Sequence, residues 1–167
     1  MKSSLLAVLA LTAARGVFAA DLTINVEIPN LPVAEYHRPY VAIFIEGADQ
    51  QIAANLALWY QVRGDHTKWL PDLRQWWRKG GRDAKVPVDG LTGATRPAGQ
   101  HIVKFDAAQA PLSGLKPGSY ALVVEAVREV GGREAVRIPF EWPAKAQKNV
   151  SAAGAKELGA VSLTLNP

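Results

Sequence analysis

Hydrophobic positions along the chain recur mostly with the two-residue period of β-strands. Residues 22–28 alternate apolar and polar side chains and stop at Pro29, which is typical of a half-buried strand. Residues 40–45 are a continuous apolar run, short and β-branched enough to predict a strand buried on both faces. In all, seven segments carry strand patterns: residues 22–28, 40–45, 55–62, 100–105, 119–128, 134–142 and 158–165.

The strand pattern predicts an all-β fold. Residues 119–128 and 134–142 flank Val130-Gly131-Gly132, which indicates a β-hairpin. Seven short strands with frequent turns are typical of an antiparallel β-sandwich, immunoglobulin-like or similar. The Cys…Trp…Cys spacing of true immunoglobulin domains is absent, so the topology stays open. Residues 144–156 are polar and rich in Ala, and we expect a surface loop there.

One long insertion, residues 63–99, interrupts the strand pattern. Loops of more than about 15 residues in compact domains tend to be functional. Residues 69–79 predict a short helix, since apolar side chains recur there at spacings of three and four, and Gly80-Gly81 is a plausible C-terminal stop. That apolar face comprises Leu70, Leu73, Trp76 and Trp77. The sandwich is therefore interpreted as a scaffold and the insertion as the functional region.

Residues 1–19 have the composition of a signal peptide: a positive start, an apolar stretch, and small residues at Val17 and Ala19 before the expected cleavage. We expect residues 20–167 to form a single exported domain. The whole chain has 19 basic and 15 acidic residues; removal of Lys2 and Arg15 leaves 17 basic, or a net charge of +2. This near-neutral balance argues against nucleic-acid binding.

Residue types that carry redox or metal chemistry are scarce. The chain has no Cys, and its single Met is Met1, which excludes disulfides, thiolate metal sites and thioether-linked haem in the exported domain. His37, His66 and His101 have no ligand-like spacing, so no metal site is predicted. No nucleophile elbow or nucleotide-binding glycine loop is present, and no catalytic residue is assigned. Any redox role requires a bound cofactor.

The insertion ends in the stretch Asp89-Gly90-Leu91-Thr92-Gly93-Ala94-Thr95. Its pattern, D-x-x-T-G-A-T, resembles the acceptor sites of the sodium-pumping NADH:quinone reductase and the related ferredoxin-oxidising complex. There a flavin transferase attaches FMN to the last threonine through a phosphoester. The resemblance implies covalent FMN on Thr95, with small residues around it so that the loop enters the transferase. The matching positions are Asp89, Thr92, Gly93, Ala94 and Thr95.

A second resemblance covers essentially the whole exported chain. Five segments resemble the bacterial family called domain of unknown function 2271: residues 33–40, 67–70, 73–77, 93–99 and 128–134. That family is periplasmic and is often encoded near a flavin transferase and a membrane protein of the PepSY type. The resemblance implies these two partners, the second being a PepSY-type membrane oxidoreductase.

The sequence supports three hypotheses. The first is a periplasmic flavoprotein electron carrier with FMN on Thr95, an electron-transfer subunit rather than a stand-alone enzyme. Trp69, Trp76 and Trp77 are candidates to stack on the flavin ring or to dock a partner, although packing of the helix on the sandwich better explains at least two of them. A nearby basic group could neutralise the flavin phosphate, and a solvated helix face explains it equally well; its members are Lys68, Arg74, Arg78, Lys79 and Arg82. The second is a cofactor-free periplasmic binding or adaptor module that uses the Trp-rich insertion. The third is a carbohydrate-binding sandwich, which lacks a clear polar cluster to read sugar hydroxyls.

Overall fold

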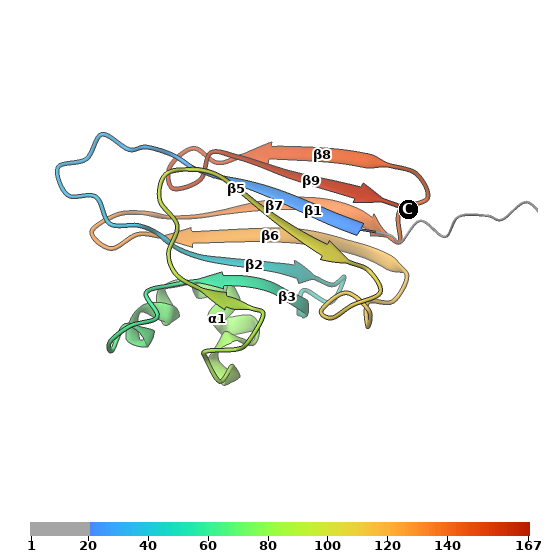
Figure 1. The fold of residues 1–167 in the computed structure, drawn as a ribbon, viewed down its shortest axis with the longest axis horizontal. Coiled ribbons are helices and arrows are strands. Elements are labelled where there is room, and N and C mark those ends of the chain that lie inside the picture. The colour runs from blue at the N-terminus through green and yellow to red at the C-terminus, as the bar shows by residue number, and fades with distance from the viewer. Residues whose placement is uncertain (1–20) are drawn as a thin grey trace, which may run out of the picture.

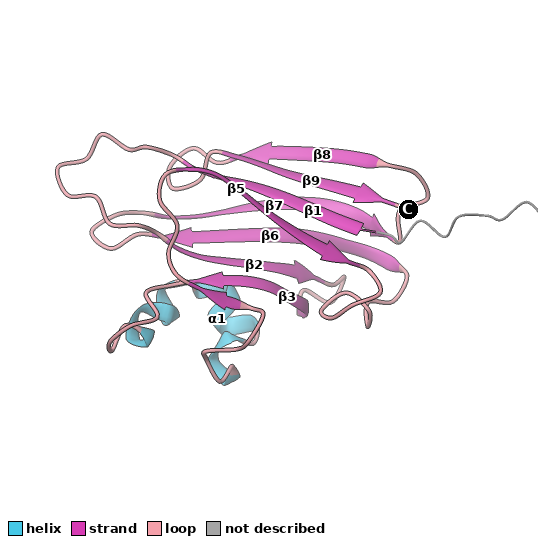
Figure 2. Cartoon of the chain, in the orientation of Figure 1, coloured by secondary structure: helices cyan, strands magenta, loops and turns pink. Residues whose placement is uncertain are grey.

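The structure, a computed structural model, describes residues 21–167 and shows a β-sandwich with short helices on one side (Figures 1 and 2). The proposed signal peptide lies outside the described residues. The four-stranded sheet, called sheet A, has the order β5-β1-β9-β8, and the five-stranded sheet B has the order β4-β3-β2-β6-β7. All neighbouring strands are antiparallel except β3 and β4. The predicted antiparallel sandwich is confirmed.

All seven predicted strands are present, with changes at their ends. Sheet A contains β1 Asp21–Ile28, β5 Gly99–Asp106, β8 Lys148–Ala153 and β9 Ala160–Asn166. Sheet B contains β2 Tyr40–Glu46, β3 Ile52–Trp59, β4 Thr92–Gly93, β6 Gly118–Val127 and β7 Arg133–Trp142. Strand β3 begins and ends three residues before the predicted segment 55–62. The predicted hairpin is confirmed, since β6 pairs with β7 from Gly118↔Trp142 to Val127↔Arg133.

The expectation of a surface loop over residues 144–156 was wrong. Strand β8 lies within that range and pairs with β9 along its length, from Lys148↔Leu165 to Ala153↔Ala160. Only Val150 and Ala152 of this edge strand pack against the core. Because these inward side chains are small, the alternation of β8 is too weak to recognise from the sequence.

Sheet B is buried on both faces, as the continuous apolar run of β2 predicts. Its inner face packs on sheet A in the main core. On its outer face, Phe44, Leu58 and Val123 form a second core with Leu73 and Trp76 of the insertion. Figure 1 shows the helical part of the insertion on this outer side. The insertion is therefore part of the folded core as well as a surface feature.

The predicted helix over residues 69–79 is split in two. A 3-10 helix, η1, spans Thr67–Asp72, and α1 spans Arg74–Lys79. Between them Leu73 leaves the helical conformation, at φ −73° and ψ 71°. Pro71 lies inside η1; it lacks the backbone N–H that a continuous α-helix uses and disfavours α geometry at the residue before it. A further short turn, η2, spans Gly81–Asp83.

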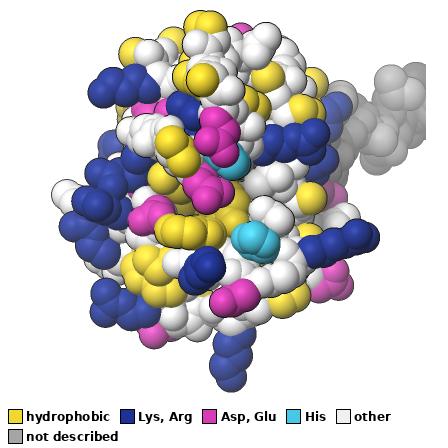
Figure 3. Space-filling view, turned by 90° about the vertical axis from the view of Figure 1, so that its left-hand side faces the viewer, with side chains coloured by type: hydrophobic (Ala, Val, Ile, Leu, Met, Phe, Trp, Pro, Cys, Tyr) yellow, Lys and Arg dark blue, Asp and Glu magenta, His cyan; other side chains and the backbone are white. Residues whose placement is uncertain are grey.

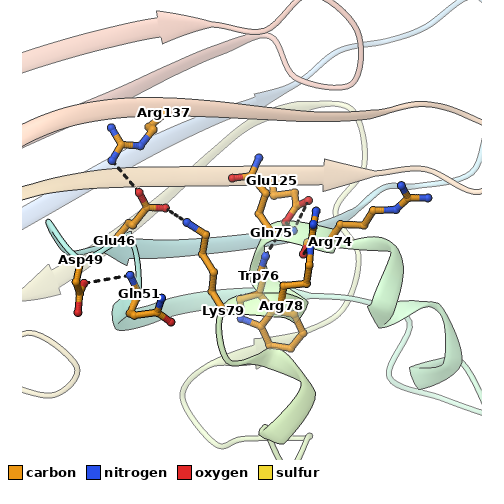
Figure 4. Close-up of polar contacts among 10 residues, drawn as sticks. All are labelled: Glu46, Asp49, Gln51, Arg74, Gln75, Trp76, Arg78, Lys79, Glu125 and Arg137. Carbon is orange, nitrogen blue, oxygen red and sulfur yellow. Dashed lines mark hydrogen bonds and ion pairs between the residues drawn. The ribbon is translucent and has the colours of Figure 1, made fainter.

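Two buried carboxylates hold α1 against sheet B (Figure 4). The Glu125 carboxylate accepts hydrogen bonds from the backbone N–H groups of Gln75, at 3.0 Å, and Trp76, at 2.9 Å. These are donors of the first turn, which an α-helix cannot satisfy itself. At the other end of α1, Lys79 and Arg137 both pair with Glu46. The helix is thus fixed at one end to β6 and at the other to β2, and Glu46 also joins β2 to Arg137 of β7.

Candidate functional site

A cavity of about 670 Å³ lies at one end of the sandwich. Four parts of the chain meet there: the β1–β2 loop, the start of the insertion, the β4–β5 loop and the β6–β7 turn (Figure 1). Ligand pockets commonly have volumes of about 300–1,000 Å³. The lining residues are Tyr36, His37, Arg38, Tyr40, Gln61, Trp69, Asp72, Arg74, Thr95 and the run Val127 to Arg133.

The cavity unites segments that are far apart in the sequence. Each of the five segments that carry the second resemblance supplies at least one lining residue, and only Gln61, Asp72 and Val127 come from elsewhere. Figure 3 looks onto this end of the molecule. Hydrophobic side chains gather near the centre of this face, beside acidic and histidine side chains, and Lys and Arg side chains lie around its periphery.

Thr95 is the motif residue that reaches this cavity. It is half-buried and lies in the β4–β5 loop, which leads from sheet B to sheet A. Among the described residues, no hydrogen bond ties its hydroxyl group to another protein group. Thr95 therefore lines the cavity, and within the described part of the chain its hydroxyl is not held by another protein group.

The other motif residues form the support for this loop. Thr92 and Gly93, expected on a loop, are strand β4, which pairs in parallel with Leu58 and Trp59 of β3. The Thr92 hydroxyl donates a hydrogen bond to the Val88 carbonyl oxygen at 2.9 Å. Of the two motif threonines, Thr92 is thus engaged in the turn.

The two glycines of the motif, Gly90 and Gly93, differ in backbone conformation. Gly90 has φ +73°, in the left-handed region that favours glycine, and the Asp89 carboxylate accepts its N–H at 3.0 Å. The backbone of Gly93 is not in that region; it is extended in β4. An added Cβ at Gly93 would lie 3.6 Å from Trp59 Cδ1, an ordinary contact. Ala94 is exposed, so a small side chain there matches the expected access of a transferase.

The three tryptophans of the insertion have different environments. Trp76 is 1% exposed, and its indole N–H donates to Asn55 Oδ1 at 2.9 Å. Trp77 is half-buried, and its ring centroid lies 6.3 Å from that of Trp76. Neither lines the cavity, and the enclosed ring of Trp76 has no open face for a cofactor. Trp69 does line the cavity and is 41% exposed, with Lys68 Nζ 5.4 Å from its ring centroid.

Positive charge predominates in the cavity lining. The lining contains four arginines, Arg38, Arg74, Arg128 and Arg133, and two acidic residues, Asp72 and Glu129. Arg74 belongs to the basic group singled out in the sequence. Lys79, from the same group, is instead paired with Glu46.

Arg128 is the buried member of this lining. Its Nε donates to Glu157 Oε2 at 2.9 Å and its Nη2 to Glu157 Oε1 at 3.2 Å. Its Nη1 is buried and has no hydrogen-bond partner, and the same is true of the Tyr36 hydroxyl. Both residues line the cavity, and the Arg128 guanidinium lies 6.0 Å from the Tyr36 ring centroid.

Tyr40 supplies a neutral phenol to the lining. Burial raises its pKa above the ordinary value of 10, and the negative charge of Glu129 acts in the same direction. Its hydroxyl donates to the His66 carbonyl oxygen at 3.3 Å. Tyr40 is therefore protonated near neutral pH and contributes an aromatic wall rather than a charge.

Sequence reasoning assigned Thr95 to the site and named Trp69 as a candidate stacking residue, but it did not assign Tyr36 or Arg128. Tyr36 and Arg128 lie inside resemblance segments, which was the signal available for them. The fold brings Tyr36 and Arg128 to the same cavity, because the pairing of β2 with β6 places the β1–β2 loop beside the β6–β7 turn.

Two further properties concern the part of the chain that the structure describes. Within residues 21–167, no group of three or more His, Cys, Asp or Glu side chains is placed to hold a metal ion. Over the same range, no helix has the length and apolar character needed to cross a membrane.

Comparison with known proteins gives one match. The sequence profile of a family described as "Predicted periplasmic protein (DUF2271)" matches residues 21–160. No curated protein and no solved structure matches the chain. The matched range contains every cavity-lining residue.

Proposed function

The chain belongs to the DUF2271 family of predicted periplasmic proteins, and on that premise we propose that it is a periplasmic electron carrier with FMN bound covalently to Thr95. One observation supports the proposal above the others: the last threonine of the D-x-x-T-G-A-T stretch lies at the wall of a 670 Å³ cavity lined by aromatic and basic side chains. The motif and a cavity suited to a flavin thus occur at the same place.

The attachment would use the Thr95 hydroxyl as the nucleophile. Its oxygen attacks the phosphorus on the FMN side of the FAD pyrophosphate, in a reaction catalysed by a flavin transferase. A bond from Thr95 Oγ to phosphorus forms, the bond from that phosphorus to the bridging oxygen breaks, and AMP leaves. The hydroxyl proton passes to base, and no electrons are exchanged.

The lining residues fit the bound group. Tyr36, Tyr40 and Trp69 provide aromatic surfaces for a planar ring, and stacked aromatic pairs contribute about 0.5–1.5 kcal/mol beyond burial. Arg38 and Arg74 are exposed and lie in the same lining as Thr95, where they would neutralise a phosphodiester. When bound, FMN would supply reversible electron transfer, which no side chain of this chain supplies.

The electron donor or acceptor would be a PepSY-type membrane oxidoreductase, as the family resemblance implies. The exposed Trp69 at the cavity supports contact with a partner at this end of the molecule. In this proposal the chain transfers electrons and turns over no substrate alone.

The decisive experiment is the intact mass of the exported protein from cells that also express a periplasmic flavin transferase. We expect a gain of one FMN less one water, mapped to the peptide that contains Thr95, and a yellow colour that survives denaturation. Thr95→Ala should abolish both and leave the circular dichroism spectrum unchanged. An unmodified mass, with the transferase active on a known acceptor, would refute the proposal and favour the colourless adaptor.

A further inference from the structure

We infer that the cavity also recognises the flavin ring without the covalent bond, through the Arg128 guanidinium and the Tyr36 hydroxyl. The identity of the ligand rests on the proposed function, whereas the recognition elements are features of the structure. The inference concerns a non-covalent binding site that survives when Thr95 cannot be modified.

The first element is a guanidinium held in a fixed orientation. Glu157 accepts hydrogen bonds from Arg128 Nε and Nη2, and its Oε1 also accepts the backbone N–H of Gly132 at 2.7 Å. Only 6% of the Arg128 side chain and 4% of the Glu157 side chain are exposed. This pairing occupies one edge of the planar group and leaves Nη1, with its two N–H donors, unpaired.

The turn is shaped around this guanidinium. A Cβ at Gly131 would lie 2.5 Å from Arg128 Cζ, so only glycine allows the side chain to lie across the turn. Val130, the residue before it, has φ +51°, which a β-branched residue adopts at a cost. The chain thus keeps an unfavourable turn geometry together with a buried, partly unpaired charge. These costs are understandable if the guanidinium serves a ligand.

The second element is the Tyr36 hydroxyl, which is buried without a partner in the same lining. Buried polar groups in proteins are nearly always hydrogen-bonded, and an unsatisfied one costs about 1–3 kcal/mol. Here two such donors belong to adjacent lining residues, with the guanidinium 6.0 Å from the Tyr36 ring. Both atoms are closed off from solvent in this structure, so a ligand that presents neighbouring acceptors would satisfy both after a small shift of the lining side chains.

The pyrimidine edge of the flavin ring has the required chemistry. It is planar and carries carbonyl oxygens and a ring nitrogen as acceptors, and it gains negative charge on reduction. A guanidinium matches such an edge better than an ammonium group does, because its donors lie in one plane. Thr95 and Arg128 both line the cavity, so a cofactor attached through its phosphate at Thr95 would have this edge available to Arg128.

The test uses the unmodified protein, produced without a transferase and checked by mass, and riboflavin as the probe. Riboflavin has the ring but no phosphate, so its binding reports ring recognition alone. We expect saturable one-to-one quenching of riboflavin fluorescence. Tyr36→Phe should weaken binding by about 3- to 10-fold, the range of a single hydrogen bond, and Arg128→Lys by at least about 10-fold.

Tyr36→Phe is the primary variant, since it removes an oxygen without a protein partner and should not impair folding. Tyr120→Phe is the matched control: its hydroxyl bonds the Lys116 carbonyl oxygen outside the cavity lining, and riboflavin affinity should not change. Absence of saturable binding, or equal affinity in Tyr36→Phe, would overturn the inference.

The outcomes separate the two proposals. Riboflavin binding that depends on Tyr36, in a protein that the transferase leaves unmodified, would sustain ring recognition and refute covalent attachment. A modified Thr95 with no riboflavin binding by the unmodified protein would sustain attachment and overturn ring recognition.

Discussion

At the scale of single residues, the two motif threonines have different roles. The Thr92 hydroxyl donates a hydrogen bond to the Val88 carbonyl oxygen within the turn, whereas Thr95 lines the cavity. We predict that Thr92→Val loses about 0.5–1.5 kcal/mol of unfolding free energy, the contribution of one hydrogen bond, and still accepts FMN at Thr95. Urea unfolding and intact mass measure the two effects. Loss of the mass increase in Thr92→Val, with the fold intact, would show that the transferase reads Thr92 directly.

A second residue-scale prediction concerns Gly81, which lies within the insertion at the start of η2. A Cβ added at Gly81 would overlap the ring of Trp76, which is 1% exposed and fixed by its bond to Asn55. We predict that Gly81→Ala destabilises the protein by about 1–3 kcal/mol, as overpacking does. Gly114→Ala is the matched control, because nothing lies within 4 Å of an added Cβ there. Equal unfolding midpoints of the two variants would contradict this account of the Trp76 packing.

At the scale of elements, α1 depends on Glu125. Burial raises the pKa of Glu125 above the ordinary 4.5 and outweighs the N–H groups of Trp76 and Gln75, which favour the charged form. The folded state then binds the Glu125 proton more tightly than the unfolded state does. The contribution of this protonation to the unfolding free energy is therefore fully present below pH 4.5. It is lost as the pH rises through the raised pKa. The stability difference between wild type and Glu125→Gln should therefore fall with rising pH, measured by urea unfolding.

Glu46, at the other end of α1, provides a control of opposite sign. Burial alone would raise its pKa, but the hydrogen bonds and charges of Lys79 and Arg137 outweigh burial and hold the pKa below 4.5. Its linked stability is present above pH 4.5 and is lost as the pH falls through the lowered pKa. The difference in unfolding free energy between wild type and Glu46→Gln, measured by urea unfolding, should fall toward acid pH. The same pH slope in both variants would contradict the opposite environments.

At the scale of the whole molecule, the carboxylates of Glu157, which is buried, and Glu134, which is half-buried, join the two sheets at the cavity end. Glu157, just before β9 of sheet A, pairs with Arg128 after β6 of sheet B. Glu134 on β7 accepts four backbone N–H groups from residues 155–158. We predict that Glu157→Ala costs about 3–5 kcal/mol, since it leaves a buried guanidinium uncompensated. In a double-mutant cycle measured by urea unfolding, the double variant Glu157→Ala/Arg128→Leu should lose less unfolding free energy than the two single variants lose in sum. Additive losses would contradict the coupling.

The sequence was sufficient for the strands whose side chains face clearly different environments. In β1 and β7, alternate positions are buried and partly or fully exposed, so hydrophobic periodicity identified them. The same signal failed for β8, whose inward side chains are small, and for β4, which is two residues long and held by parallel pairing with β3. Helix 69–79 was located, but its break at Leu73 depended on Pro71 and on packing against sheet B.

By itself, the sequence determined the strand-rich sandwich, the position of the insertion, and the motif that ends at Thr95, because these depend on residue types and short spacings. Only the tertiary structure decided that Tyr36, Trp69, Thr95 and Arg128 surround one cavity and that Trp76 is a core residue. It also decided that two donors are buried there without partners. Those facts depend on which strands pair and on the path of the insertion over sheet B, and contacts between distant segments leave no local pattern in the chain.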